Sequence, residues 1–502
     1  MANTAVISKS HLIYGVCLPL AVLIGYLLAE PLESGSIAVV VLVLSVLSIP
    51  VLMRWHHAIL IFSCNAAISL AFMPGRPALW MISALLSFFF LILNRSMGQD
   101  VRFFRARNVS FSLLFLGAVT LVTAYSTGGI GFGSFGASNA GGKRYFTIIV
   151  GIMLYFALST QVISRKHAGL ATAVFFLSAL TGMAGYIAAI GGPAFYFLVE
   201  LFPIEGALDE TNVSGMGVMG SGIVRLGGLT SVAVGLFCFV MARYGAKGVL
   251  DLSKPWRLLL LLLAVVANLY SGFRSNMMLF ILTFGVIFYL EGLFRTRYFL
   301  VLALISLLAG AVTLPYTQKL PLVVQRTLCF LPINVDPVVQ ANADGSTDWR
   351  LEMWQEVLPT VPRYLFKGKG YVMDPDDMYL FEEGRKRGFA KGYEGAMLAG
   401  DYHSGPLSLI IPLGISGVIA FLWFLIASVQ VLRQNLRFGD PSLRHINTFL
   451  LAFFVVHSVF FFFIFGSLYS DVAIFAGLIG LSVSLNGGVC RPLELAPEIE
   501  PD

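Results

Sequence analysis

Long apolar stretches alternate with short polar ones along most of the chain. Each apolar stretch is close to the ~20 residues that a helix needs to cross the hydrocarbon core of a bilayer. The stretches are residues 11–29, 35–53, 58–74, 77–94, 110–127, 145–163, 169–190, 226–242, 257–272, 276–293, 298–315, 405–432, 447–467 and 471–487. Several are short or closely spaced, so the pattern predicts an all-α, polytopic membrane bundle of about 12 to 14 transmembrane helices.

One long polar segment, residues 316–403, interrupts this pattern. Its mixed charge and helix-like pieces, such as residues 349–358, predict a single large, partly helical loop outside the bilayer. The chain is therefore expected to divide into five parts. These are an N-terminal transmembrane scaffold (1–94), transmembrane helices carrying Arg225 and Arg274 (95–315), the large loop (316–403), C-terminal transmembrane helices (404–487) and a tail (488–502).

Composition excludes a soluble protein, because 57% of the residues are hydrophobic and only 12% are charged. Mean hydropathy is +0.83. The net charge of +6 would suit nucleic acid. However, the basic residues gather in loops on one predicted side, as in the run Arg95, Arg102, Arg105 and Arg107. By the positive-inside rule this side is cytoplasmic, with both termini, and the large loop is on the outer face. We expect membrane lipids as partners and no nucleic acid.

Two arginines lie at the outer ends of predicted spans. Arg225 begins one span, and Arg274 lies in the tight turn Ser271-Gly272-Phe273-Arg274 between two apolar helices. Charge at such a depth is costly and usually has a partner. A guanidinium group can bind two phosphate oxygens at once, so a diphosphate is a natural partner for both. The alternative is that both side chains reach lipid headgroups or pair with a loop carboxylate such as Asp401 or Glu352.

Two histidines of the C-terminal part of the chain need separate interpretations. His403 is at the junction between the large loop and the next span, where an imidazole can act as a general base near neutral pH. The alternative interpretation is that His403 caps the helix or lies at the membrane interface without a catalytic role. His457 lies in mid-span among Val and Phe residues, and we expect it to be a packed core residue that bonds to a neighbour.

The large loop holds further candidates for binding. Arg350 and Trp354 are four residues apart, so they share a face of a helix, and Trp with Arg suits sugar faces and anions. Trp354 and Tyr402 are candidates for acceptor or sugar contact. Lys367-Gly368-Lys369-Gly370 predicts a tight basic turn that can approach an anion, with an ordinary solvated loop as the alternative. No metal or other cofactor is expected.

These pieces together resemble a known family. His403-Ser404, nine residues, Gly414, two residues and Gly417 resemble the signature of bacterial O-antigen ligases and protein O-oligosaccharyltransferases, whose wider superfamily includes the O-antigen polymerases. The arginine motifs, the Lys-Gly turn, the large loop and three following spans occur in the right order. The resemblance covers roughly residues 220–430.

The resemblance implies a membrane glycosyltransferase of the bacterial inner membrane that acts on the periplasmic face in surface polysaccharide biosynthesis, such as lipopolysaccharide. Its donor would be a glycan on undecaprenyl diphosphate, and its acceptor a lipid or another glycan. His403 would be the base that activates the acceptor hydroxyl. Arg225, Arg274 and Arg350, with Lys367 and Lys369, would bind the diphosphate. Gly414 and Gly417 would be structural.

Two alternatives remain open at the level of sequence. A ligase attaches a finished glycan, whereas a polymerase extends a repeat unit or a related enzyme glycosylates protein, and all need the same base and diphosphate site. A transporter or flippase of lipid-linked sugars would need no base, and usually has similar halves and charges in mid-membrane. Here the halves look dissimilar and the charges gather at the outer boundary, which favours an enzyme.

Overall fold

The computed structural model describes residues 18, 19, 21, 22, 25, 34–73, 75–98, 100–129, 142–204, 223, 225–372, 375–389 and 391–492. The first predicted span, 11–29, and the last ten residues of the tail lie wholly or largely outside this set. The regular secondary structure of the described part is helical. It contains no strand, only an isolated bridge between Ser69 and Ala78.

The helices follow one another with short connections. In chain order they are α2 (Ser34–Ser63), α3 (Leu79–Ser96), α4 (Arg107–Ser126), α5 (Gly142–Ser159), α6 (Arg165–Leu177), η2 (Ser178–Met183), α7 (Ala184–Gly191), η3 (Pro193–Phe195), α8 (Tyr196–Leu201), α10 (Gly227–Val249), α11 (Pro255–Ser271), α12 (Arg274–Leu290), η4 (Leu293–Arg295), α13 (Arg297–Thr313), η5 (Leu314–Lys319), α14 (Leu322–Leu328), α15 (Pro337–Val357), η6 (Leu358–Thr360), α16 (Val361–Tyr364), α17 (Pro375–Lys386), α18 (Glu394–Leu398), α19 (Gly405–Phe438), η7 (Pro441–Leu443), α20 (Arg444–Phe463) and α21 (Leu468–Asn486).

Seven helical segments of the described chain are long and apolar enough to cross a membrane. They are Leu79–Ser96, Arg107–Ser126, Arg165–Gly191, Gly227–Val249, Gly405–Phe438, Pro441–Phe463 and Leu468–Asn486. Four shorter apolar helices accompany them, at Leu47–Ser63, Pro255–Ser271, Arg274–Leu290 and Arg297–Leu308. The protein is therefore an all-α, multi-pass membrane protein, which confirms the predicted fold class.

One pair of predicted spans is wrong. Sequence analysis separated residues 35–53 and 58–74 at the polar run 54–57, but α2 continues through that run to Ser63, and residues 64–78 are not helical. The residues of the run, Arg-Trp-His-His, are compatible with helix, so their polarity alone does not end it. The Pro and Gly residues that follow, including Gly75 with a φ of 75° and Pro77, prevent a second helix there.

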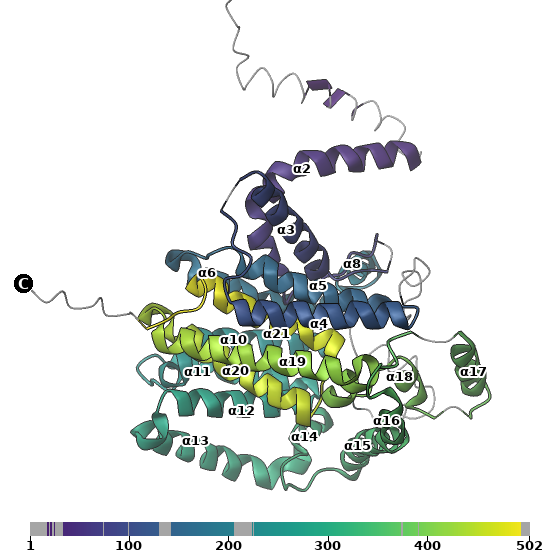
Figure 1. The fold of residues 1–502 in the computed structure, drawn as a ribbon. Helices are drawn as coiled ribbons and strands as arrows, with labels where there is room; N and C mark the ends of the chain where they lie inside the picture. Colours follow the sequence, from purple (N-terminus) through teal and green to yellow (C-terminus); the bar gives the residue numbers. More distant parts are fainter. Residues whose placement is uncertain are drawn as a thin grey trace, which may run out of the picture. The chain divides into compact units, whose positions relative to one another are not determined.

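The chain forms two compact units, residues 1–57 and 58–502. Within the larger unit α5 packs along α21, α19 packs along α4, and α10 packs against α11 and α20. Buried phenylalanines fill the space between α19, α20 and α21, where the rings of Phe421, Phe454, Phe461 and Phe475 contact one another. The loop helices α15 to α18 lie at one end of this bundle, beside the first residues of α19 (Figure 1).

Candidate functional site

His403 lies in the short connection between α18 and α19. Its φ of 47° is in the left-handed region, which non-glycine residues rarely adopt and which is often found at functional positions. The imidazole lies between two aromatic rings, with centroids 5.0 Å from Trp349 of α15 and 5.1 Å from Phe465 of the α20–α21 turn. Nδ1 is enclosed and has no hydrogen-bond partner within the described chain.

The surroundings of His403 favour its neutral form. Burial lowers the pKa of its imidazole below the ordinary 6.5, and the positive charge of Arg350 lowers it further. The carboxylate of Asp401 acts in the opposite direction and also accepts the backbone N–H of His403 at 3.4 Å. A neutral imidazole at physiological pH is the form that a general base requires.

The two arginine motifs that the sequence singled out contact each other. The N–H of Leu226 donates to the carbonyl of Ser271 at 3.0 Å, which places the start of α10 beside the α11–α12 turn. Arg225 Nη2 donates to Ser346 Oγ at 3.4 Å, and Arg274 Nη2 donates to Thr347 Oγ1 at 3.0 Å. Two arginines, one just before α10 and one at the start of α12, therefore bond to neighbouring residues of α15.

Arg350 completes this cluster. Burial lowers the pKa of its guanidinium, and the positive charges of Arg274 and Arg225 lower it further. Because Arg350 also acts on the imidazole of His403, the three arginines and the histidine belong to one electrostatic group. Among the residues that the structure describes, neither Arg274 nor Arg350 pairs with a carboxylate. Cationic groups held together in this way favour binding of a multivalent anion.

A fourth arginine, Arg326, was not identified from the sequence. It lies on α14 with only 4% of its surface exposed. Its Nε donates to Asn342 Oδ1 at 2.7 Å, its Nη1 donates to the carbonyl of Gly272, and its Nη2 is 3.5 Å from Ser346 Oγ. Arg326 therefore shares Ser346 with Arg225 and fixes the α11–α12 turn on α15.

Helix α15 holds the whole site together. Its contacts recur at the three- and four-residue intervals that place side chains on one face of a helix. The residues concerned are Asn342, Ser346, Thr347, Trp349, Arg350 and Trp354. The first three bond to arginines from the bundle, and the last three surround the His403 connection. One helix thus sets the spacing between the cationic cluster and the imidazole.

Comparison with known proteins bears directly on this site. Residues 258–422 match the family model described as O-antigen ligase. This match supports the O-antigen ligase superfamily for the part of the chain that it covers. The matched segment contains Arg274, Arg326, Arg350 and His403, whereas Arg225 lies outside it. No curated protein matches the chain. The match supports an enzyme of the O-antigen ligase or polymerase type in general.

The Lys-Gly turn fits into a break in α19. At Gly414 the helix has a φ of 65° and a ψ of −167°, so the carbonyls before it lose their partners within the helix. The N–H of Lys369 donates to Ile411 O at 2.7 Å and that of Gly370 to Pro412 O at 3.0 Å, while Ile415 N–H donates back to the loop. Two motifs 45 residues apart are therefore one structural unit.

The side chains of Lys367 and Lys369 are exposed, and none of the described contacts joins them to the arginine cluster. Gly414 and Gly417 are both buried. A Cβ at Gly414 would lie 2.8 Å from a carbonyl of the docked turn, and one at Gly417 would lie 2.3 Å from the Leu413 side chain. Both glycines therefore allow close approach, whereas a diphosphate role for the lysines remains a prediction.

We expect Gly368→Ala to destabilise the protein by about 2–4 kcal/mol. Gly368 has a φ of 75°, and a Cβ there would lie 2.3 Å from the carbonyl oxygen of Pro412. Thermal unfolding in detergent should show a lower apparent Tm. Gly345→Ala is the matched control, because Gly345 is within α15 with nothing within 4 Å of its added Cβ. Equal stability of the two variants would contradict the docking.

Trp354 and Tyr402 lie in the packing behind His403. Trp354 Nε1 donates to the carbonyl of Tyr402 at 2.8 Å, which fixes the residue that precedes the histidine. Both rings belong to a small apolar cluster that includes Met353 and Leu407, and Tyr402 is only 4% exposed. The structure therefore places them where they orient the His403 connection. Trp349, which the sequence analysis did not select, is the tryptophan that faces the imidazole.

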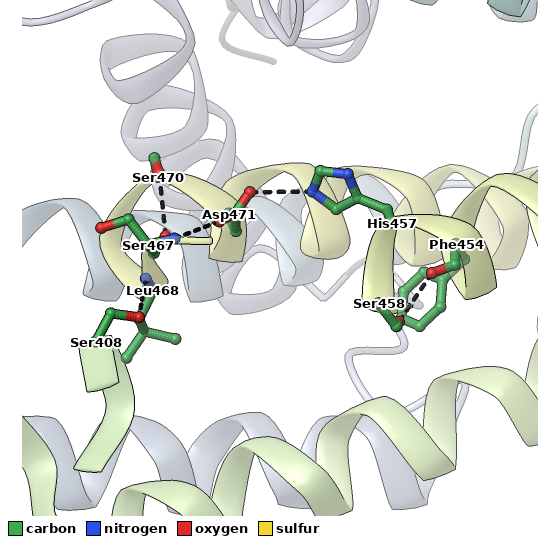
Figure 2. A network of polar contacts seen from close by, with 8 residues as sticks. All are labelled: Ser408, Phe454, His457, Ser458, Ser467, Leu468, Ser470 and Asp471. Atoms are coloured by element: carbon green, nitrogen blue, oxygen red, sulfur yellow. Dashed lines mark hydrogen bonds and ion pairs between the residues drawn. The ribbon is translucent and has the colours of Figure 1, made fainter. Parts of the chain in front are cut away.

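A buried polar network supports the other side of the imidazole (Figure 2). His457 of α20 bonds to Asp471 of α21 at 3.0 Å, and the other oxygen of Asp471 accepts the Ser467 N–H at 2.7 Å. The N–H of Leu468 donates to Ser408 Oγ at 3.1 Å. These bonds tie the α20–α21 turn, and the phenylalanine that flanks the imidazole, to the first turn of α19. The expectation that His457 is a packed residue with a bonded neighbour is confirmed.

Proposed function

We propose that this protein transfers a glycan from undecaprenyl diphosphate to an acceptor hydroxyl on the periplasmic face of the inner membrane, as an O-antigen ligase. The observation that carries the proposal is that α15 holds both groups, since Arg225 and Arg274 donate to its Ser346 and Thr347 and its Trp349 lies against the imidazole of His403. A base beside a cationic cluster is what glycosyl transfer from a diphosphate needs. The family match supports the same reaction class.

In the proposed reaction the acceptor oxygen attacks the anomeric carbon of the donor sugar. The acceptor proton passes to Nε2 of His403 as the new glycosidic bond forms. The bond between the anomeric carbon and the diphosphate oxygen breaks, and its electron pair leaves with the diphosphate. Arg225, Arg274 and Arg350 stabilise the negative charge that develops on this leaving group. The Trp349 and Phe465 rings hold the imidazole in one orientation and limit its contact with water.

The orientation in the membrane follows from charge. The loops at the opposite end of the bundle from His403 carry Arg95, Arg102, Arg105 and Arg107, and the positive-inside rule assigns such loops to the cytoplasm. The loop segment 316–403 is then periplasmic, and the C-terminus cytoplasmic. The five-part division of the chain given above follows this orientation and is proposed with it.

Release of undecaprenyl diphosphate by the reconstituted protein tests the function. With a lipid-linked glycan and a lipid acceptor supplied, we expect release that depends on the acceptor and a product formed by a single transfer. A ladder of products without added acceptor would assign a polymerase instead. Movement of intact donor across the vesicle bilayer, with no release, would show that the protein is a transporter.

The surroundings of His403 predict the pH dependence of the reaction. The base must be neutral, so kcat/KM should fall only below a pKa that is lower than 6.5. Arg350→Gln removes a charge that lowers this pKa, so the pKa should rise and the acidic limb of the kcat/KM profile should move to higher pH. Asp401→Asn removes a charge that raises the pKa, so the acidic limb of the profile should move to lower pH. The measurement is kcat/KM from pH 4.5 to 8 for the three proteins. Limbs that coincide would argue against His403 as the titrating base.

A further inference from the structure

A large basic cavity lies at the end of the bundle opposite His403. Its volume is about 920 Å³. It is lined by the start of α4, by Gln430 and Gln434 near the end of α19, and by the residues that follow α21. His403 lies two residues before α19, so at 1.5 Å per residue Gln430 and Gln434 are about 40 Å away along the helix. One phosphate group cannot occupy both places, and the cavity is not part of the transfer site.

The charge of this cavity is strongly unbalanced. Five arginines and one aspartate contribute to its wall, namely Arg95, Arg102, Arg105, Arg107, Arg491 and Asp100. Burial lowers the pKa of Arg105, and the neighbouring positive charge of Arg102 lowers it further. Like charges held together at a partly buried site repel each other, and a bound anion relieves that repulsion.

Arg102 pairs with Asp100 at 3.2 Å, and the other four arginines divide into two groups. Arg95 and Arg105 brace the wall, since Arg95 Nη1 donates to Val101 O at 2.7 Å and Arg105 Nη1 donates to Gly487 O at 3.1 Å. Arg107 and Arg491 are exposed, and their side chains make no hydrogen bond or ion pair within the described chain. These two are therefore available to a ligand.

Helix α4 adds a further positive element. Its first residues, Arg107 and Asn108, line the cavity, and Ala106 before them provides no side-chain cap. The first turn also has no acidic residue. The free N–H groups and the positive end of the helix dipole therefore face a space that is already cationic, an arrangement that binds phosphate groups.

Apolar surface continues from the cavity along the membrane-facing side of α19. Gln430 lines both the basic cavity and an apolar groove of about 360 Å³ between α19 and α20. Val429, Val455 and Phe462 are among the groove's lining residues. A site that is cationic at one end and apolar at the adjoining end matches a molecule with an anionic head and hydrocarbon chains.

We propose that this cavity binds the phosphate headgroup of an anionic phospholipid, with its chains along the α19–α20 groove. In the proposed orientation this is an inner-leaflet lipid, and the binding does not depend on the transfer reaction. A competing occupant is the chain itself, because residues 493–502 contain Glu494, Glu498, Glu500 and Asp502. The apolar groove favours the lipid, since an acidic peptide gains nothing from hydrocarbon contact.

Native mass spectrometry of the full chain in detergent tests the proposal. The probes are phosphatidylglycerol and phosphatidylcholine with identical acyl chains, and inorganic phosphate as competitor. We expect wild-type protein to retain phosphatidylglycerol preferentially, and Arg107→Gln/Arg491→Gln to lose about tenfold or more of that affinity. Arg107→Lys/Arg491→Lys should retain most of it. Arg295→Gln/Arg297→Gln removes the same charge elsewhere on the same predicted side and should bind as wild type does.

Several outcomes would overturn the proposal. Equal retention of phosphatidylglycerol by the wild type and the Gln variant would show that the cavity does not hold the headgroup. Equal loss in the Arg295/Arg297 control would show a general charge effect. Displacement by millimolar inorganic phosphate would assign the site to a soluble phosphate compound. Lipid preference that appears only in Glu494→Gln/Glu498→Gln/Glu500→Gln would make the acidic tail the occupant.

Discussion

Replacing His403 by asparagine is expected to lower acceptor-dependent release of undecaprenyl diphosphate by about 10²- to 10⁴-fold, the usual contribution of a general base. Asparagine is the better probe than alanine, because residue 403 has a φ of 47° and asparagine tolerates that conformation. The variant therefore removes the imidazole while keeping the backbone. The measurement is the rate of release at saturating acceptor, together with thermal unfolding to show that the fold is unchanged.

Two comparisons make this test decisive. Ser404→Ala changes the neighbouring position without removing a base, so it should retain most of the activity. A more acidic acceptor hydroxyl loses its proton with less help from a base, so the defect of the His403 variant should shrink with acceptors of lower hydroxyl pKa. If the His403 variant keeps wild-type turnover with a normal fold, His403 is an interfacial residue and the base lies elsewhere.

The membrane architecture is the part of the structure that the sequence predicted well. A helix in lipid must satisfy its own backbone hydrogen bonds, so an apolar run of the right length leaves little choice of structure. The predicted runs at 405–432 and 471–487 correspond to α19 and α21 within a few residues. The error at 58–74 arose because apolar composition alone was used there, while the Pro and Gly residues that prevent a helix were not.

The site was only partly predictable, because most of its geometry is tertiary. The sequence singled out His403 and the three arginines by their positions at the ends of apolar runs, and the structure brings these residues together through α15. Arg326 also lies in a short apolar run, the residues of α14. The polar segment around this run obscures the pattern, so the sequence did not indicate this arginine.

Other parts of the site left no signal in the sequence. Phe465 flanks the imidazole from a turn 62 residues further along the chain, and local pattern says nothing of such a contact. The same holds for the Lys-Gly turn in the break of α19. Pro412 and Gly414 indicate a kink, but the partner of the freed carbonyls could not be inferred. A break that exposes backbone groups at membrane depth needs such a partner.

Arg274→Gln is expected to lower kcat by about 10²- to 10³-fold, the cost of removing one preorganised charge from a developing anion. Arg274 begins α12 and is fixed by Thr347, so its guanidinium does not have to reorganise as the diphosphate leaves. Arg274→Lys keeps the charge but loses the bidentate geometry of the guanidinium. Its kcat should therefore lie between those of Arg274→Gln and the wild type. Arg363→Gln removes an exposed charge from the large loop, residues 316–403, and is the matched control.

The same variant shows whether the arginines and His403 act in one step. Substitutions of residues that stabilise the same transition state have strongly non-additive effects on kcat. Arg274→Gln should therefore lower kcat by a much smaller factor in the His403→Asn background than in the wild type. If the two residues act in separate steps, the factors by which each substitution lowers kcat would instead multiply in the double variant. A rise in KM with unchanged kcat would mean that Arg274 only binds the donor, and charge stabilisation of the leaving group would then have to come from Arg350 and Arg225.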